Sequence, residues 1–90
     1  KVVVIPIREE LRGEALKVSQ VLRNAGIFVE VEVMGRKMAK ALEDADRRKM
    51  DFAVIVGERE LKEGSIVLRD LSKRQQRTVP IESLVDEMKH

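Results

Sequence analysis

Two uninterrupted apolar runs constrain the fold of this 90-residue chain more than any other feature. Residues 2–5 read Val-Val-Val-Ile, and Phe52–Val56 reads Phe-Ala-Val-Ile-Val. Strands that are apolar on both faces are typical of the centre of a sheet that helices cover on both sides. Both runs are therefore predicted to be buried central strands.

The segments around the first run alternate between helical and extended periodicity. Residues 11–25 carry apolar side chains three or four positions apart and are followed by Gly26, which predicts an amphipathic helix with a left-handed glycine after its end. Residues 27–33 alternate in polarity, which is typical of a half-exposed edge strand. The apolar spacing in residues 38–45 predicts a second helix.

The last third of the chain predicts a hairpin and a closing helix. A helical turn around residues 59–62 is followed by Gly64, which can adopt a left-handed conformation. Residues 65–69 and 76–79 are expected to be extended on either side of a polar loop. Pro80 suits the first turn of a final amphipathic helix.

This order of elements predicts an α/β fold of three layers. Alternating strands and helices favour right-handed crossovers and a parallel sheet core, to which the hairpin adds antiparallel strands. We therefore expect residues 1–90 to form a single domain. It would have a mixed five-stranded sheet with helices on both faces.

Composition excludes several classes of protein. The chain has no cysteine, which excludes a disulfide framework and thiolate chemistry and fits a cytoplasmic location. No apolar run approaches the roughly 20 residues of a membrane span. His90 is the last residue, and no glycine-rich phosphate loop is present, so we expect no catalytic or metal site. The start without Met, directly in a strand, indicates a fragment of a longer protein.

Basic residues are concentrated in two segments although the net charge is only +2. Residues 36–49 contain six basic and three acidic residues, and residues 66–80 contain four basic and one acidic. Such patches favour a polyanionic partner. A highly charged, solvated surface, as in thermophilic proteins, is the open alternative.

Several motifs resemble one known family in order and spacing. The most specific is the run of residues 57–71, Gly-Glu-Arg-Glu-Leu-Lys-Glu-Gly-Ser-Ile-Val-Leu-Arg-Asp-Leu. Weaker matches are Val-Val-Ile-Pro-Ile at residues 3–7, Ala-Gly-Ile-Phe-Val-Glu-Val at 25–31 and Gly-Arg-Lys-Met at 35–38. Together they resemble the C-terminal anticodon-binding domain of class IIa aminoacyl-tRNA synthetases, most closely the histidyl enzymes. Threonyl, prolyl and glycyl synthetases share the fold and remain alternatives.

The resemblance implies a tRNA-binding module without chemistry of its own. Its parent would be a histidine–tRNA ligase that uses ATP and Mg in a separate catalytic domain. The expected partners are the anticodon loop of a histidine-specific tRNA and that catalytic domain. The fragment is expected to be monomeric and the parent a homodimer, with no cofactor in this domain.

The resemblance also implies the site residues. Glu60 and Arg69 are expected to contact the same extruded base, a carboxylate and a guanidinium being suited to guanine. Their alternative is a surface ion pair worth at most about 1 kcal/mol. The other anticodon contacts are expected from Gly35, Arg36, Lys37 and Glu58, and the phosphate contacts from Lys73, Arg74 and Arg77. Gly35 offers backbone contacts alone where relatives can carry a base-reading side chain.

Two further expectations follow from the residues. Phe28 is the one candidate for aromatic stacking on an exposed strand face, and we expect it to pack under a helix instead. A second class of function also stays open, because domains of this fold serve as regulatory or dimerisation modules. A solvated charge run would explain Lys73, Arg74 and Arg77 in that case.

Overall fold

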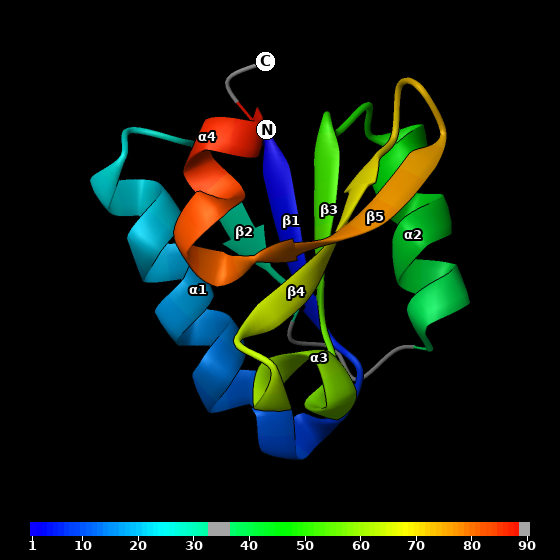
Figure 1. Cartoon of the computed structure of the whole chain (residues 1–90). Helices are drawn as coiled ribbons and strands as arrows, with labels where there is room; N and C mark the ends of the chain where they lie inside the picture. The colour runs from blue at the N-terminus through cyan, green and yellow to red at the C-terminus, as the bar shows by residue number, and fades with distance from the viewer. Residues whose placement is uncertain (33–36, 89–90) are drawn as a thin grey trace.

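The computed structural model describes residues 1–32 and 37–88 of the chain. The strands are β1 (Val2–Pro6), β2 (Val29–Val31), β3 (Phe52–Val56), β4 (Ser65–Asp70) and β5 (Gln75–Pro80). The helices are α1 (Arg12–Asn24), α2 (Met38–Arg47), α3 (Glu58–Lys62) and α4 (Leu84–Met88), with short 3₁₀ turns at Glu9–Leu11 and Ile81–Ser83. The predicted order of elements is confirmed (Figure 1).

One mixed sheet has the strand order β2-β1-β3-β4-β5. β1 pairs in parallel with β2 and β3, whereas β4 is antiparallel to both β3 and β5. The two apolar runs thus lie at the centre, and the alternating segment forms the edge strand β2, as the sequence predicts. The predicted mixed sheet with a parallel core and an antiparallel hairpin is confirmed.

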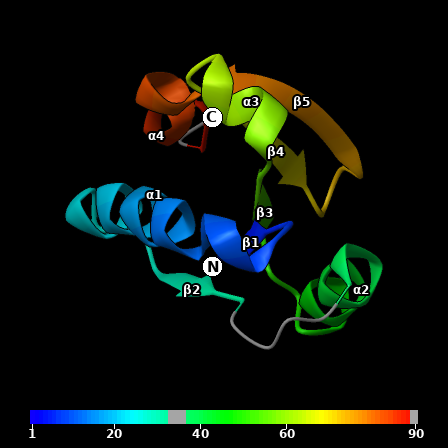
Figure 2. The same cartoon turned by 90° about the horizontal axis from the view of Figure 1, so that it is seen from below.

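Helices cover the two faces of the sheet unequally (Figure 2). α1 and α4 lie on one face, over the larger apolar core that includes Val4, Leu22 and Ile66. α2 lies on the other face, where Ala41 and Ala45 pack on β1 and β3 in a smaller core. No β5 side chain of the described residues belongs to that smaller core, so the β4–β5 hairpin extends beyond the helical cover.

Local conformations follow the sequence signals with small shifts. Gly26 and Gly64 have positive φ values of 82° and 71°, so both glycines take the left-handed conformation that side chains disfavour. Pro80 does not begin a helix as predicted but ends β5, with ψ 141°, because its backbone still pairs with Ser65. The polar loop is also shorter than predicted, since β4 includes Asp70 and β5 begins at Gln75.

Phe28 does not pack under a helix, contrary to the expectation, because the residue is 62% exposed. Its neighbour Val29 is buried in the larger core, and alternation along the strand turns Phe28 to the opposite face. The smaller core on that face lies over β1 and β3, so it leaves the edge residue Phe28 uncovered. In the described part of the chain, no helix is long and apolar enough to cross a membrane.

Candidate nucleic-acid interface

The carboxyl ends of β1 and β3 form one candidate site, which we call the strand-end hollow. Because β1 and β3 are parallel, the residues that follow them come together at the same end of the sheet. A hollow of about 490 Å³ lies there. It is lined by Ile7, Arg8, Glu58, Arg59, Glu60 and Lys62. Three basic and two acidic side chains therefore surround a space open to a polar ligand.

The carboxylate of Glu60 lies against Gly57, the residue that precedes its own helix α3. Gly57 precedes α3 with φ −120° and is buried. A carboxylate oxygen of Glu60 lies so close to the position of a Cβ atom on Gly57 that the two atoms would overlap. The missing side chain at Gly57 thus lets the Glu60 carboxylate fold back toward the strand end, where Glu60 is half-buried.

Glu58 already has a protein partner in the same hollow. Arg8 donates from Nη1 to Glu58 Oε1 at 2.9 Å, and both side chains are well exposed. Sequence reasoning missed Arg8, although its place two residues after β1 is a recognisable signal. Arg8 therefore joins the candidate site, and it competes with any ligand for Glu58.

The carboxyl end of β2 lies at the same end of the sheet, since β2 is parallel to β1. Gly35 and Arg36 lie outside the described residues. Lys37 is exposed and precedes α2 in an extended conformation. Its ammonium group has no hydrogen bond or ion pair with the described residues, so it is available to an anion.

Arg69 does not meet Glu60, which corrects the expectation that both contact one base. β4 runs antiparallel to β3, and Arg69 pairs with Ala53 near the start of β3. Glu60 follows the opposite end of β3, beyond Val56. About 10 Å of strand separates Ala53 from Val56. The sequence identified both residues but not the direction of β4, which places them at opposite ends of the sheet.

Arg69 instead faces a groove beside α2. This α2 groove, of about 220 Å³, is lined by Ala39, Leu42, Glu43, Asp46, Arg69, Leu71 and Arg74. Arg69 donates from Nη1 to Gln76 Oε1 at 3.0 Å across the β4–β5 pair. This hydrogen bond holds the guanidinium group on the α2 side of the sheet, over the part of that face that α2 does not cover.

The three hairpin bases do not form one phosphate-binding surface. Arg77 pairs with Glu87 of α4, whereas Arg74 lines the α2 groove. Lys73 and Arg77 both line a different hollow on the α4 side of the hairpin. Arg74 therefore lies on a different side of the hairpin from Lys73 and Arg77, and the expected phosphate contacts of the three bases stay a prediction.

Asp70 organises the turn that carries these bases. Its Oδ1 atom accepts hydrogen bonds from the Ser72 and Lys73 backbone amides at 3.1 and 3.0 Å and from the Ser72 hydroxyl at 2.8 Å. The Lys73 amide bond, followed by the Ser72 hydroxyl bond, lowers the pKa of the Asp70 carboxyl below its ordinary value. Arg74 then closes the turn with a positive φ of 55°.

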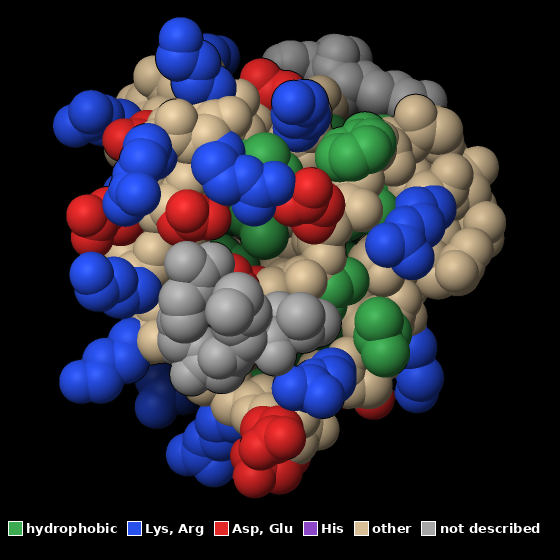
Figure 3. All heavy atoms as spheres, turned by 180° about the vertical axis from the view of Figure 1, so that it is seen from behind, with side chains coloured by type: hydrophobic (Ala, Val, Ile, Leu, Met, Phe, Trp, Pro, Cys, Tyr) green, Lys and Arg blue, Asp and Glu red, His purple; other side chains and the backbone are tan. Residues whose placement is uncertain are grey.

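Two bases of the basic segment of residues 36–49 are paired with acids. Arg47 pairs with Glu43, and Arg48 pairs with Glu30 at 2.6 Å and with Asp44. The hydrogen bond and charge of Glu30 raise the pKa of Arg48 further above its ordinary value. Figure 3 shows Lys and Arg side chains spread over one face, with Asp and Glu among them. Affinity for a polyanion therefore depends on local sites rather than on a continuous basic patch.

The fold and these strand-end and hairpin sites define an α/β ligand-binding module. The model of the family described as "Anticodon binding domain" matches residues 1–90. The chain belongs to the anticodon-binding domain family, and the predicted resemblance is confirmed.

Proteins similar in sequence to this chain include histidine–tRNA ligases. The enzyme of Pyrococcus furiosus is 37% identical over 89 residues, which cover 99% of this chain and 21% of the relative. That of Methanocaldococcus jannaschii is 38% identical, with 94% of this chain and 21% of the relative covered. A crystal structure of histidyl-tRNA synthetase from Nostoc sp. PCC 7120 matches with a TM-score of 0.95 at 36% identity, covering 98% of this chain and 21% of that chain.

A threonyl relative shares the fold. The RNA binding domain of threonyl-tRNA synthetase from Cryptosporidium parvum Iowa II has a TM-score of 0.90 at 18% identity, covering 99% of this chain and 22% of that chain. The chain therefore spans about one fifth of the length of the relatives that it matches.

Proposed function

We propose that this chain is the anticodon-reading domain of a histidine–tRNA ligase. The family membership and the identities of 37% and 38% to two such ligases support the histidine enzyme over its threonyl relative. The observation that carries the proposal is the strand-end hollow, where the absence of a side chain at Gly57 makes room for the Glu60 carboxylate. The whole enzyme would join histidine to its tRNA with ATP and Mg in a separate domain.

Two subsites share the recognition in this proposal. Glu60 accepts hydrogen bonds from the N–H edge of one unstacked base at the strand-end hollow. Arg69, held by Gln76, donates to a different nucleotide along the uncovered sheet face. Arg59 and Lys62 contribute charge near Glu60, and Arg74 contributes it near Arg69. Lys37 contributes charge at the start of α2. Gly35 and Arg36 keep their predicted role as contacts from the loop before α2.

The test is a comparison of anticodon stem-loops. The 90-residue chain is titrated with a labelled stem-loop of histidine tRNA and with one that differs in the anticodon alone, and anisotropy is followed. The proposal expects Glu60→Gln and Arg69→Ala each to weaken binding to the histidine stem-loop by about 1–3 kcal/mol and to the other stem-loop by less. Lys17→Ala, on the outer face of α1, is the matched control. Equal losses on both stem-loops would remove the base-reading role.

A protein-interaction role is favoured by apolar side chains that are exposed on α1 and, on the other face of the sheet, at Phe28. Leu16 and Val21 of α1 are 48% and 43% exposed, and Phe28 is 62% exposed. We propose that they contact the catalytic domain of the parent homodimer, while this fragment alone stays monomeric and acts in the cytoplasm. Sedimentation tests this, since a tight dimer that ignores tRNA would favour a dimerisation module instead.

A further inference from the structure

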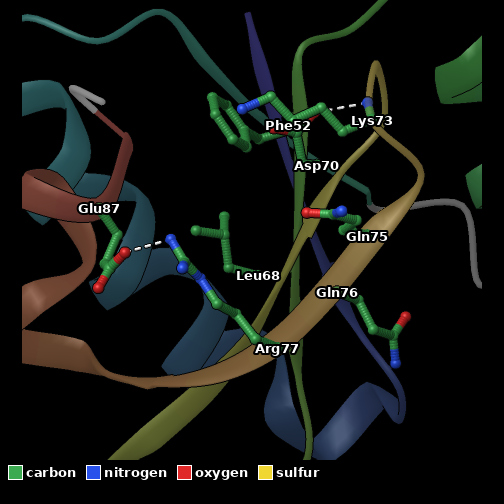
Figure 4. A pocket seen from close by; sticks show the side chains of 8 residues that line it. All are labelled: Phe52, Leu68, Asp70, Lys73, Gln75, Gln76, Arg77 and Glu87. Carbon is green, nitrogen blue, oxygen red and sulfur yellow. Dashed lines mark hydrogen bonds and ion pairs between the residues drawn. The ribbon is translucent and has the colours of Figure 1, made fainter.

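A hollow on the α4 side of the hairpin has no part in the proposed anticodon contacts. This hairpin hollow, of about 460 Å³, lies between β3, the β4–β5 hairpin and α4 (Figure 4). It is lined by Phe52, Leu68, Asp70, Lys73, Gln75, Gln76, Arg77 and Glu87. A smaller hollow of about 310 Å³ adjoins it and shares Phe52 and Asp70. The combined space suits a ligand of small-molecule size.

The floor of the hairpin hollow is apolar and partly aromatic. Leu68 is 3% exposed and belongs to the larger core. Phe52 packs against that core yet stays partly exposed, so part of its ring faces the hollow. A partly exposed ring over an apolar floor offers a stacking surface to a flat ligand.

The walls carry polar groups that lack protein partners. The Lys73 ammonium group and the Gln75 side chain make no hydrogen bond or close ion pair with the described residues, although the charge of Lys73 helps to lower the pKa of Asp70. Asp70 accepts its three hydrogen bonds at Oδ1, so its Oδ2 atom can accept a hydrogen bond from a ligand. The ion pair between Arg77 and Glu87 closes one side of the hollow (Figure 4).

We propose that the hairpin hollow binds a nucleotide, with its base stacked on Phe52, its base edge on Gln75 and its phosphate on Lys73. An amide side chain donates and accepts hydrogen bonds, as the edge of a base requires. The ammonium group of Lys73 neutralises a phosphate as a point charge. This site goes beyond the proposed function, because it lies on the hairpin face opposite Arg69 and can hold a mononucleotide by itself.

The charges of the hollow favour a nucleotide over a bare anion. Asp70 and Glu87 place two carboxylates around the space, against Lys73 and Arg77. A free phosphate gains little there, since Arg77 is already paired with Glu87. A base that stacks on Phe52 and donates an N–H to Asp70 Oδ2 adds interactions that a phosphate lacks.

The test follows backbone amide signals of the ¹⁵N-labelled 90-residue chain. GMP, AMP, CMP, UMP, inorganic phosphate and a single-stranded RNA oligonucleotide are each titrated. Saturable shifts at Phe52, Lys73 and Gln75 with a mononucleotide support a free nucleotide as the occupant. The same shifts with the oligonucleotide alone support a nucleotide within a strand. Equal shifts with inorganic phosphate, or none with any ligand, overturn the proposal.

Variants separate this site from the anticodon contacts. Phe52→Leu and Gln75→Ala should each weaken nucleotide binding about tenfold. Phe28→Leu removes the other phenylalanine, which lies outside the hollow, and should leave binding unchanged. Gln75 is exposed, so Gln75→Ala keeps the test valid if Phe52→Leu impairs folding. Nucleotide binding that persists in the Glu60→Gln/Arg69→Ala double variant distinguishes this proposal from the anticodon proposal, and unchanged binding in both hollow variants would overturn it.

Discussion

The carboxylate of Glu60 folds back against Gly57 and occupies the space that a side chain at Gly57 would need. Gly57 has φ −120°, an extended conformation open to any residue, so the glycine is required for space and not for its backbone angle. The contacting atom is the end of a flexible side chain, which can move away at low cost. Gly57 therefore sets the position of the Glu60 carboxylate without setting the fold.

Gly57→Ala should displace the Glu60 carboxylate and weaken binding to the histidine anticodon stem-loop as much as Glu60→Gln does. The stability of the fold should change by about 1 kcal/mol or less, because the loss of a glycine before α3 is offset by a less flexible unfolded chain. Anisotropy titration and urea unfolding measure the two effects. Gly13→Ala is the matched control, since a Cβ at Gly13 meets nothing within 4 Å. Additive losses in the Gly57→Ala/Glu60→Gln double variant would refute the positioning role.

The separation of Glu60 from Arg69 predicts independent contributions to RNA binding. Arg69 lies beside Ala53 at one end of β3, and Glu60 follows the other end. Substitutions that are far apart and share no partner usually add within about 0.5 kcal/mol. The double-mutant cycle of Glu60→Gln and Arg69→Ala, measured with the histidine stem-loop, should therefore show additive losses. A coupling energy above about 1 kcal/mol would mean that both side chains contact one base after all.

Gln76 should control the availability of Arg69. Its Oε1 atom accepts the Arg69 hydrogen bond at 3.0 Å, and both side chains lie on the face that α2 leaves open. Gln76→Glu should turn this bond into an ion pair and weaken stem-loop binding by about 1 kcal/mol, with a smaller loss for Gln76→Ala. In the Arg69→Ala background, Gln76→Ala should have no effect on binding. A loss that persists in that background would show that Gln76 contacts RNA directly.

Apolar periodicity predicted the fold because the elements differ so clearly in pattern. Residues 2–5 are buried and apolar on both faces, which suits a central strand of a covered sheet. Val29 is buried while Glu30 is half-exposed, which is the pattern of an edge strand. Gly26 and Gly64 mark ends where the backbone takes a positive φ. Each of these signals is local, so it could be read without knowledge of the neighbouring strands.

The site was harder to predict because it depends on strand direction and on pairings between distant residues. Glu60 and Arg69 lie nine positions apart in sequence, yet the reversal between β3 and β4 separates them in space. Arg77 was expected to meet phosphate, but the α4 residue Glu87 already pairs with it. Phe28 is exposed because the smaller core, which lies under α2, does not extend to the edge strand β2. None of these outcomes is encoded in a local pattern.

The Asp70 turn predicts a pH-dependent contribution to stability. The folded-state pKa of this carboxyl lies below its ordinary value of 3.8, because backbone and hydroxyl hydrogen bonds favour the charged form. A lowered folded pKa means that the stabilisation is fully present above the unfolded pKa. It is lost as the pH falls through the folded pKa. The contribution should therefore be constant from neutral pH to about pH 5 and should decline as the pH falls below 3.8 toward the folded pKa.

Asp70→Ala should lower the free energy of unfolding by about 1 kcal/mol at pH 7, since the Ser72 and Lys73 amides lose their acceptor at the surface. Urea unfolding of both proteins at pH 7, 5 and 3 measures the difference between them. Every other carboxyl is present in both proteins, so the difference isolates Asp70. The difference in unfolding free energy should shrink at pH 3, because part of the stabilisation is lost once the pH falls below the ordinary pKa of 3.8. Asp70→Asn keeps an acceptor oxygen without the charge, so at pH 7 its loss should be smaller than that of Asp70→Ala. A gap that stays constant from pH 7 to pH 3 would show that the charge of Asp70 does not stabilise the turn.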